Sequence, residues 1–343
     1  MHLSPLRRVA ALAVLAGALV VPAATAPATA NAVTPMPPNL RALPAADLSI
    51  TTNGNDMLLL SATTWNDGAG PLELRGGEVE GTGKQRVYQR IHQSDGSIVE
   101  NLAGSFSYHP GHAHTHFDDY AKYSLQSVDN PGNPQRFGAK MTFCIIDTYV
   151  ADLALPGAPP SPVYRFCNND VQGMSVGWGD IYPYYLEGQA IDIDGLPSGD
   201  YYLRVEADPQ GHLVESDETD NVSTIVVRIQ SGVVSVLDSD DDGCDDAQEQ
   251  GLSPDAGGRR DPLDPWDFYD VTSNGAIDLS DTLAVLGKFG LQPGNAGYDA
   301  AFDRVRGDPD PWRTTAATGA HAGIDLEDAL ANLASFGHTC ADP

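Results

Sequence analysis

Basic residues are scarce in this chain of 343 residues. Only 19 Lys and Arg stand against 47 Asp and Glu, so that the formal net charge is −28. A surface with so few cations cannot neutralise a run of phosphates, which argues against nucleic acid as a partner. Cysteine is also sparse, with four residues. At this length, one large core or two ordinary ones can be buried, which excludes a minimal disulfide scaffold.

Long hydrophobic runs are absent too. The most apolar stretch, residues 9–21, has 13 residues, whereas a helix needs about 20 to span a bilayer. It follows Arg7 and Arg8 and precedes small residues ending at Ala32. This order predicts a secretory signal peptide over residues 1–32 and a secreted protein without a retained membrane span. A retained membrane anchor is the alternative.

Removal of this signal would take away two arginines and leave a net charge of −30. Such acidity attracts cations, whether metal ions or amines, although adaptation to salt would produce the same composition. In an exported chain, four cysteines predict two disulfides, for which three connectivities exist. Proximity along the chain favours one bridge between Cys144 and Cys167 and another between Cys244 and Cys340.

From about residue 38 to residue 230 the chain consists of short apolar segments separated by Gly, Pro, Asn and Asp. The segments most typical of strands are residues 57–63, 86–91, 140–146, 201–205 and 223–229. Short strands at this spacing predict an antiparallel β-sandwich, or a related antiparallel β architecture, over residues 33–230. The expected fold class is therefore mainly β.

Beyond a boundary expected near Ser231, residues 231–343 contain acidic loops and two segments that repeat each other. Residues 277–290 are matched by residues 324–337. In both segments leucines recur at i, i+4 and i+7, which predicts one apolar face of a short helix, and each segment ends at Gly. Neither helix can bury that face alone, so we expect the two to pack together in a small α-helical module.

Four of the nine histidines lie within residues 109–116. Side chains alternate between the two faces of a strand, so His112, His114 and His116 would project from the same face. Three imidazoles without a thiolate suit copper or zinc, and Cu(II) has the higher affinity. A polar strand surface and a tract that merely scavenges metal are the alternatives.

With these histidines, the chain resembles the catalytic domain of the lysyl oxidases over roughly residues 39–229. The resemblance depends on five motifs in the family's order, which are residues 112–116, 138–148, 172–182, 189–193 and 215–221. It implies a secreted copper amine oxidase whose cofactor, lysine tyrosylquinone, forms from Lys140 and Tyr182. Such an enzyme converts primary amines, here peptidyl-lysine or small polyamines, to aldehydes with O₂, and it releases NH₃ and H₂O₂.

Taken singly, Lys140 would be a solvated strand end and Tyr182 a core aromatic residue. The general base of the reaction is left open by the sequence. Three carboxylates near the motifs are candidates, Asp118, Asp119 and Asp180, and for each of them an ordinary surface position is the alternative.

Residues 238–249 fit a calcium loop. Oxygen ligands are expected from Asp238, Asp240, Asp242, the Cys244 carbonyl and Glu249, with a glycine for the sharp turn. The loop resembles those of thrombospondin type 3 repeats, and a solvated acidic linker is the alternative.

A second loop, residues 270–281, resembles half of a type I dockerin. Its expected calcium ligands are Asp270, Thr272, Asn274, the Ala276 carbonyl and Asp281. The repeat of this loop has Ala317, Gly319 and His321 at the ligand positions, so we expect no calcium there. One complete half argues against a cohesin-type partner and favours a stabilising or anchoring role for this dockerin-like module.

The sequence thus predicts an amine oxidase with a calcium-binding C-terminal module. A non-catalytic, metal-binding extracellular adhesion protein is the main rival. A metal-dependent hydrolase, or an oxidase without a quinone, is a third possibility, and its activity would survive the loss of the Tyr182 hydroxyl.

Overall fold

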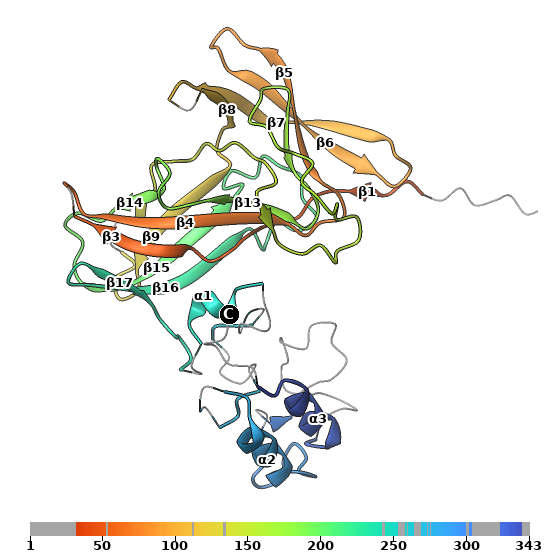
Figure 1. Ribbon diagram of the computed structural model, residues 1–343, viewed down its shortest axis with the longest axis vertical. Helices are drawn as coiled ribbons and strands as arrows, with labels where there is room; N and C mark the ends of the chain where they lie inside the picture. The colour runs from red at the N-terminus through yellow and green to blue at the C-terminus, as the bar shows by residue number, and fades with distance from the viewer. Residues whose placement is uncertain are drawn as a thin grey trace, which may run out of the picture. The chain divides into compact units, whose positions relative to one another are not determined.

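The structure is a computed structural model of the chain (Figure 1). It describes residues 32–52, 54–111, 113–132, 135–241, 244–252, 258, 260–263, 269–272, 274, 276–299, 302–303 and 323–337. Several predicted features lie outside these residues, namely residues 1–31 of the signal peptide, His112, Asp242, Ala317, Gly319, His321 and Cys340. Within the described part of the chain, no helix has the length and apolar character needed to cross a membrane.

The described residues are mainly β, and every strand pairing is antiparallel, as the sequence predicts. One sheet has the order β12-β5-β6-β7-β8, with β1 on β6. Its strands are β1 (Pro35–Met36), β5 (Leu72–Val79), β6 (Gln85–Gln93), β7 (Ile98–His109), β8 (His114–Phe117) and β12 (Val171–Met174). In this sheet β8 is an edge strand, and it carries two of the candidate histidines.

A second sheet has the order β10-β9-β15-β16-β17. Its strands are β9 (Ala121–Ser127), β10 (Arg136–Phe137), β15 (Gly199–Ala207), β16 (Val222–Gln230) and β17 (Val233–Val236). The third has the order β11-β13-β4-β14, with β2 and β3 also on β4. It consists of β2 (Leu40–Ala42), β3 (Ala46–Thr51), β4 (Met57–Asn66), β11 (Tyr149–Val150), β13 (Trp178–Tyr182) and β14 (Ala190–Asp192).

The period-2 pattern of the sequence explains how these sheets bury one side. Along β15, buried Leu203 and Val205 alternate with partly exposed neighbours, and Leu203 pairs with Leu125 of β9 and with Ile225 of β16. These side chains join residues of β4, such as Leu58, in one hydrophobic cluster. The description of this architecture as a sandwich stays a prediction, and so does the domain boundary near Ser231.

One predicted strand is wrong. Residues 140–146 form no strand but an extended segment with a single bridge between Phe117 and Phe143. Its other polar groups bond to side chains and to isolated backbone groups. The amide of Ile145, for example, donates to the side chain of Gln172 at 3.0 Å. The apolar composition of residues 140–146 predicts backbone pairing with neighbouring strands. Instead, side chains of other residues hold this backbone, so the side chains of the segment itself can face several neighbours.

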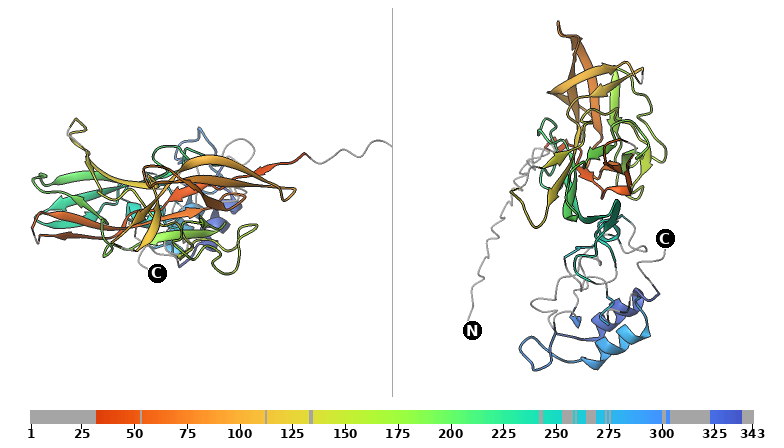
Figure 2. Two further views of the ribbon diagram at one scale, coloured as in Figure 1. Left: turned by 90° about the horizontal axis from the view of Figure 1, so that it is seen from above. Right: turned by 90° about the vertical axis from the view of Figure 1, so that its left-hand side faces the viewer.

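The C-terminal part contains α1 (Asp246–Glu249), α2 (Leu279–Gly287) and α3 (Leu326–Ala334). The last two helices lie side by side (Figure 2). The repeat seen in the sequence is reciprocal in space. The amide of Gly290 donates to the carbonyl of Ile324, and the amide of Gly337 donates to the carbonyl of Ile277, both at 2.7 Å.

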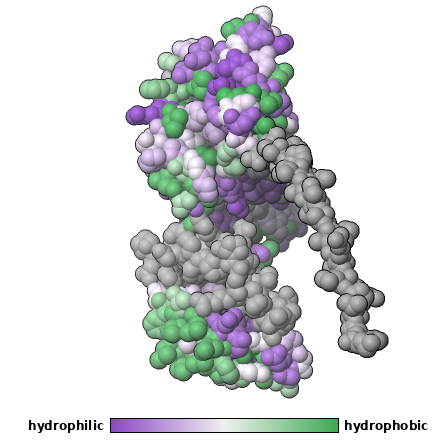
Figure 3. Space-filling view, turned by 90° about the vertical axis from the view of Figure 1, so that its right-hand side faces the viewer, coloured by the Kyte–Doolittle hydropathy of each residue, from purple (hydrophilic) through white to green (hydrophobic). Residues whose placement is uncertain are grey.

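The two helices pack against each other as predicted, but not through their leucine faces. The leucines face outward, where Figure 3 shows hydrophobic side chains gathered on the surface. The outward set, between 42% and 58% exposed, is Leu279, Leu283, Leu286, Phe289, Leu326, Leu330, Leu333 and Phe336. The helices meet through their opposite faces instead, where the Thr282 hydroxyl donates to the Asn332 side-chain oxygen at 2.6 Å. Paired polar groups can therefore be buried, and a leucine stripe alone does not fix which face of a helix is inside.

Candidate active site

The histidine segment is a hairpin and not one strand. Strands β7 and β8 pair antiparallel, with His109 opposite His114, and the turn-forming Pro110 and Gly111 lie between them. His114 and His116 share one face of β8, as the period-2 argument predicts. His109 reaches them from the partner strand, a contribution that the sequence analysis missed.

The imidazoles of β8 converge on one point. The Nε2 atoms of His114 and His116 are 2.8 Å apart, and two ligands at right angles, each about 2 Å from one ion, would lie about 3 Å apart. The Nδ1 atom of His116 lies 3.2 Å from the hydroxyl of Thr142, and the His116 side chain is buried. The ring of His109 stacks on that of His116, with centroids 5.0 Å apart. This donor set suits a copper or zinc ion.

Lys140 lies against the candidate tyrosine. Its Nζ atom is 4.8 Å from the centroid of the Tyr182 ring and 5.3 Å from that of Phe143, and it donates to the carbonyl of Glu187 at 3.4 Å. The stem of Lys140 passes Gly188, where a Cβ atom would come within 2.9 Å of the Lys140 Cβ and where φ is +83°. Only glycine suits that backbone and leaves the lysine its place.

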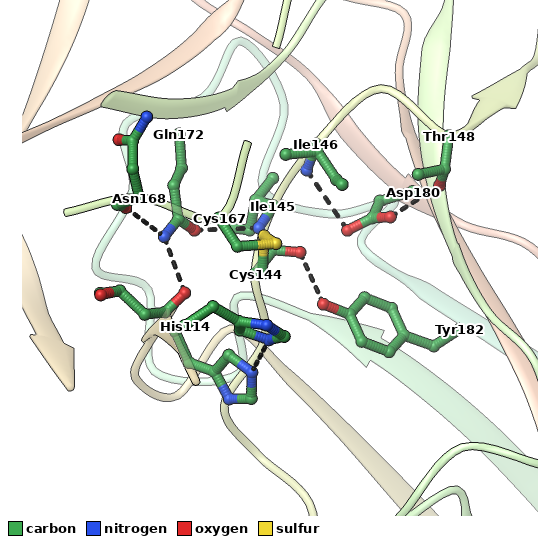
Figure 4. Close-up of a disulfide and its surroundings, with 12 residues drawn as sticks. His114, Cys144, Ile145, Ile146, Thr148, Cys167, Asn168, Gln172, Asp180 and Tyr182 are labelled. Atoms are coloured by element: carbon green, nitrogen blue, oxygen red, sulfur yellow. Dashed lines mark hydrogen bonds between the residues drawn. A yellow bond between two sulfur atoms is a disulfide. The ribbon is translucent and has the colours of Figure 1, made fainter. Parts of the chain in front are cut away.

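Tyr182 ends β13, and its hydroxyl donates to the carbonyl of Cys144 at 2.6 Å (Figure 4). The Phe143 ring meets the Tyr182 ring edge to face at 4.7 Å. Burial raises the pKa of the Tyr182 phenol well above its ordinary value, and the nearby Asp180 adds to that rise. Desolvation lowers the pKa of the Lys140 amine. The pair is therefore a neutral phenol beside an amine that loses its proton more readily than an exposed lysine does.

The predicted bridge between Cys144 and Cys167 is present. Cys244 is also in a disulfide, and its expected partner, Cys340, lies outside the described residues. The first bridge borders the candidate site, because Cys144 is the residue that accepts the Tyr182 hydroxyl.

A cavity of about 330 Å³ opens beside the lysine and the histidines. Its lining is His109, His116, Ala139, Lys140, Met141, Thr142, Glu187 and Gly188. Among these residues Glu187 carries the one carboxylate. Nothing in its sequence context distinguishes Glu187, because it follows Tyr182 in an irregular loop and belongs to no recognisable motif.

The three carboxylates considered from the sequence lie outside the cavity lining, although Asp180 is close enough to Tyr182 and Lys140 to act on the pKa of each. Asp118 forms an ion pair with Lys84 at 2.8 Å and accepts two serine hydroxyls. Asp119 occupies a turn with φ of 57°. Asp180 is 3% exposed and accepts the hydroxyl of Thr148 at 2.7 Å, and burial raises its pKa. None of the three lines the cavity.

Carboxylates also gather at the 215–221 motif. Oxygen atoms of Asp208, Glu215 and Glu218 lie within 4.8 Å of one another. Burial raises the pKa of Glu215 to about 8, although this carboxylate accepts hydrogen bonds from the Leu40 amide and from Asn221 at 2.9 Å. The motif therefore helps to close the β-rich part, since it ties the start of β2 to the residues before β16.

In the second predicted calcium loop, the last residue, Asp281, accepts hydrogen bonds from a residue near the start of the loop. Asp281 accepts both the amide and the hydroxyl of Thr272, at 3.0 and 2.8 Å, and Asp270 accepts the amide of Asn274 at 3.1 Å. Asp270 and Asp281 are buried. The structure thus brings these four residues together, with the Ala276 amide bonded to Asn274 at 3.1 Å.

In the first predicted loop, Glu249 is fully buried at the end of α1. Asp245 caps this short helix by accepting the amides of Ala247 and Gln248. Asp238 and Asp240 are described, whereas Asp242 is not, so the ligand set of this loop stays a prediction.

The described residues form an antiparallel β protein in which a partly buried tyrosine lies against a desolvated lysine, and this lysine lines one cavity with two histidines of the hairpin. Residues 86–239 match the lysyl oxidase family model. This segment contains β8, Lys140, the disulfide and Tyr182.

Individual relatives agree with the family model. The chain is 32% identical to lysyl oxidase homolog 2 of Gallus gallus over 140 residues, 33% identical to lysyl oxidase homolog 3B of Danio rerio over 139, and 31% identical to lysyl oxidase homolog 3 of Homo sapiens over 139. Each match covers 40% of this chain and 16–17% of the relative. The chain thus spans about a sixth of the length of these relatives. The β-rich part of the chain is therefore similar to the lysyl oxidase family.

Proposed function

We propose that the chain is a secreted, copper-dependent amine oxidase that carries a lysine tyrosylquinone. The observation that carries the proposal is the 4.8 Å between the Lys140 Nζ atom and the centroid of the Tyr182 ring. The experiment that tests it is the release of peroxide from a primary amine by copper-loaded protein under air, compared with Tyr182 and Lys140 variants.

Copper would be held by His114 and His116, with His112 as the expected third ligand. The 2.8 Å between the two Nε2 atoms supports this set, and the hydroxyl of Thr142 would fix the orientation of the His116 ring. When bound, copper supplies the redox chemistry by which O₂ oxidises a phenol ring.

Tyr182 is the ring to be oxidised and Lys140 the amine to be joined to it. Desolvation of Lys140 enlarges the neutral, nucleophilic fraction of its amine. The hydrogen bond to the Cys144 carbonyl and the edge of Phe143 hold the ring while the lysine approaches. The resulting quinone supplies an electron sink for the oxidation of a primary amine.

The substrate class follows from charge. The chain has 47 acidic against 19 basic residues, which favours cationic amines such as lysyl side chains or small polyamines. A non-catalytic metal-binding protein would need the histidines but would have no use for a desolvated lysine against a partly buried tyrosine.

Glu187 is the group we assign as the proton acceptor. It carries the one carboxylate of the cavity lining, and its backbone carbonyl accepts the Lys140 amine. A carboxylate there can receive the proton that leaves the carbon next to the substrate nitrogen, and it can attract the substrate ammonium.

Replacement of Glu187 by Gln is expected to lower kcat/KM for a primary amine by about 100-fold, the lower range for the loss of a general base. Quinone absorbance should still form, because Tyr182 and Lys140 are both retained. Glu78→Gln removes the same charge from an exposed side chain outside the cavity and is expected to change kcat/KM less than about twofold. Equal effects of the two variants would contradict the assignment.

The two acidic loops of the C-terminal part are proposed to bind one calcium ion each. In the second loop, buried Asp270 and Asp281 come together with Thr272 and Asn274, which supports the proposal. In the first, the buried carboxylate of Glu249 does so. The proposed role of this module is to stabilise or anchor the enzyme, and its outward leucine face is consistent with anchoring.

The repeat offers a matched test of the second calcium site. Asp281 and Asp328 are equivalent, buried residues, and each accepts the amide of its helix N-cap, Asp278 or Asp325. Asp281→Asn is expected to lower the calcium stoichiometry from two to one, since it removes a charged ligand. Asp328→Asn should leave the stoichiometry at two while costing about 1 kcal/mol of capping energy. Calorimetric calcium titration measures both. Unchanged stoichiometry in Asp281→Asn would refute the second site.

A further inference from the structure

The disulfide and a buried glutamine connect the two halves of the site. Figure 4 shows the Cys144–Cys167 bridge together with His114 and Tyr182. The carbonyl of Cys144 accepts the Tyr182 hydroxyl at 2.6 Å. On the other side of the bridge, the carbonyl of Cys167 accepts the amide of Thr115 at 3.1 Å. Thr115 stands between the two candidate ligands of β8.

Gln172 joins the same two parts of the site, the histidine strand and the segment after Cys144, through hydrogen bonds. Its side chain is fully buried on β12. The Nε2 atom donates to the carbonyls of Thr115 and Asn168, both at 2.9 Å, and the Oε1 atom accepts the amide of Ile145 at 3.0 Å. Both backbone groups of Thr115 are therefore held, the amide by Cys167 and the carbonyl by Gln172.

This arrangement matters because β8 is an edge strand. It pairs with β7 along one side. Its other side has no neighbouring strand of that sheet, and at Phe117 it is held by a single bridge to Phe143. An edge strand held along one side can slide or twist. Next to the bridge at Phe117, the bonds to Cys167 and Gln172 fix this side at Thr115, between the two histidines, to the residues that carry the Tyr182 acceptor. Displacements of about 1 Å between reacting groups can cost a hundredfold in rate.

We propose that the Cys144–Cys167 disulfide and Gln172 form a positioning clasp, which sets the distance between the metal-binding face of β8 and Tyr182 and so controls how fast the quinone forms. The proposal rests on the function proposed above. The clasp residues touch neither substrate nor metal. They act through Thr115 and through the hydroxyl of Tyr182.

Gln89 provides a matched control. It is also fully buried, and it also joins two backbone groups, donating to the Val214 carbonyl at 2.9 Å and accepting the Val214 amide at 2.7 Å. It lies on β6 and does not line the cavity. Gln89→Ala and Gln172→Ala should therefore lower the melting temperature to a similar degree, and any difference at the site reports the clasp.

The full chain is tested as wild type, as Gln172→Ala, as Gln89→Ala and as the Cys144→Ser/Cys167→Ser double variant. In Gln172→Ala we expect tenfold slower growth of quinone absorbance after copper and air are added, and a tenfold higher Kd for copper. Metal-free Gln172→Ala should also exchange amide hydrogens faster over residues 113–118. Gln89→Ala should stay within twofold of the wild type in all three measurements, and the double variant should behave like Gln172→Ala.

Equal values for Gln172→Ala and Gln89→Ala would overturn the clasp. This comparison decides the question even if the double variant does not fold. If the wild type itself forms no quinone, the oxidase proposal fails, and the clasp is judged by hydrogen exchange and copper affinity alone. Equal exchange and equal Kd in the two glutamine variants would then overturn it.

Discussion

Replacement of Tyr182 by Phe is expected to abolish quinone absorbance and amine-dependent peroxide release in copper-loaded protein. A phenylalanine ring lacks the oxygen from which a quinone starts, so the rate should fall at least about a thousandfold, or roughly 4 kcal/mol of barrier. Copper binding should persist, because the hydroxyl contacts the Cys144 carbonyl and not the histidines. Loss of that hydrogen bond should cost about 1–2 kcal/mol of stability.

Tyr120→Phe is the matched control for this result. Tyr120 is buried, its ring also meets Phe143 edge to face, and its hydroxyl also makes one hydrogen bond of 2.6 Å, to Thr64. The control variant should lose comparable stability and retain peroxide release. Peroxide release that survives in Tyr182→Phe would favour an oxidase without a quinone.

Lys140 has its own signature in the same experiment. Lys140→Arg keeps a cation but offers no amine that can lose its proton near neutral pH, so intact mass should show no crosslink. Lys122→Arg, at an ion pair with Glu206, should leave the crosslink intact. The neutral fraction of the Lys140 amine grows as pH rises. Because desolvation lowers the pKa of Lys140, this fraction becomes dominant at a lower pH than for an exposed lysine. In the wild type, crosslink formation should therefore speed up with pH and level off below the ordinary lysine pKa of about 10.4.

Much of the β fold could be predicted because it depends on a local pattern. Alternation along residues 201–205 and 223–229 predicts strands that β15 and β16 confirm. Residues 140–146 show the limit of that pattern. Their apolar composition is typical of a strand, but the side chain of Gln172 and a single bridge to Phe117 replace the ladder. Such long-range polar contacts leave no periodic trace in a sequence.

The residues of the candidate site likewise fall into two groups, those that the sequence predicted and those that it did not. The motifs that resemble lysyl oxidases singled out Lys140 and Tyr182, and the structure brings them together. His109 and Glu187 could not be found so easily. His109 reaches the site because the hairpin turn places it opposite His114, and Glu187 does so because an irregular loop passes Lys140. Both depend on how the chain turns and not on which residues repeat.

The C-terminal helices show that amphipathicity predicts which residues share an apolar face, but not whether that face points inward or outward. The regular spacing of the leucines predicts that they lie inside, yet Thr282 and Asn332 form the buried contact. The side-chain Nδ2 atom of Asn332 also donates to the carbonyl of Tyr269 at 2.6 Å. A polar pair that satisfies its own hydrogen bonds can occupy an interior, and the apolar face is then left for solvent or a partner.

His116→Ala is expected to raise the Kd for Cu(II) at least about 100-fold and to prevent quinone formation. His116 is the buried member of the pair whose Nε2 atoms are 2.8 Å apart, and removal of one imidazole leaves an incomplete ligand set. Thr142→Val should cost about tenfold in affinity, because the hydroxyl 3.2 Å from the His116 Nδ1 atom orients the ring without touching the metal. Copper titration and Cu(II) electron paramagnetic resonance measure both effects.

The order of these losses separates a metal centre from a polar hairpin surface. His92 lies on β6, which pairs with β7 of the hairpin, and its imidazole contacts Glu73 at 3.0 Å. His92→Ala should therefore leave copper affinity and quinone formation unchanged. If the hairpin merely scavenged metal, each histidine would contribute a similar small amount, and Thr142→Val would have no effect. A large loss in His116→Ala, an intermediate one in Thr142→Val and none in His92→Ala is the order that a built site requires, since the ligand, the residue that orients it and a bystander differ in their distance from the ion.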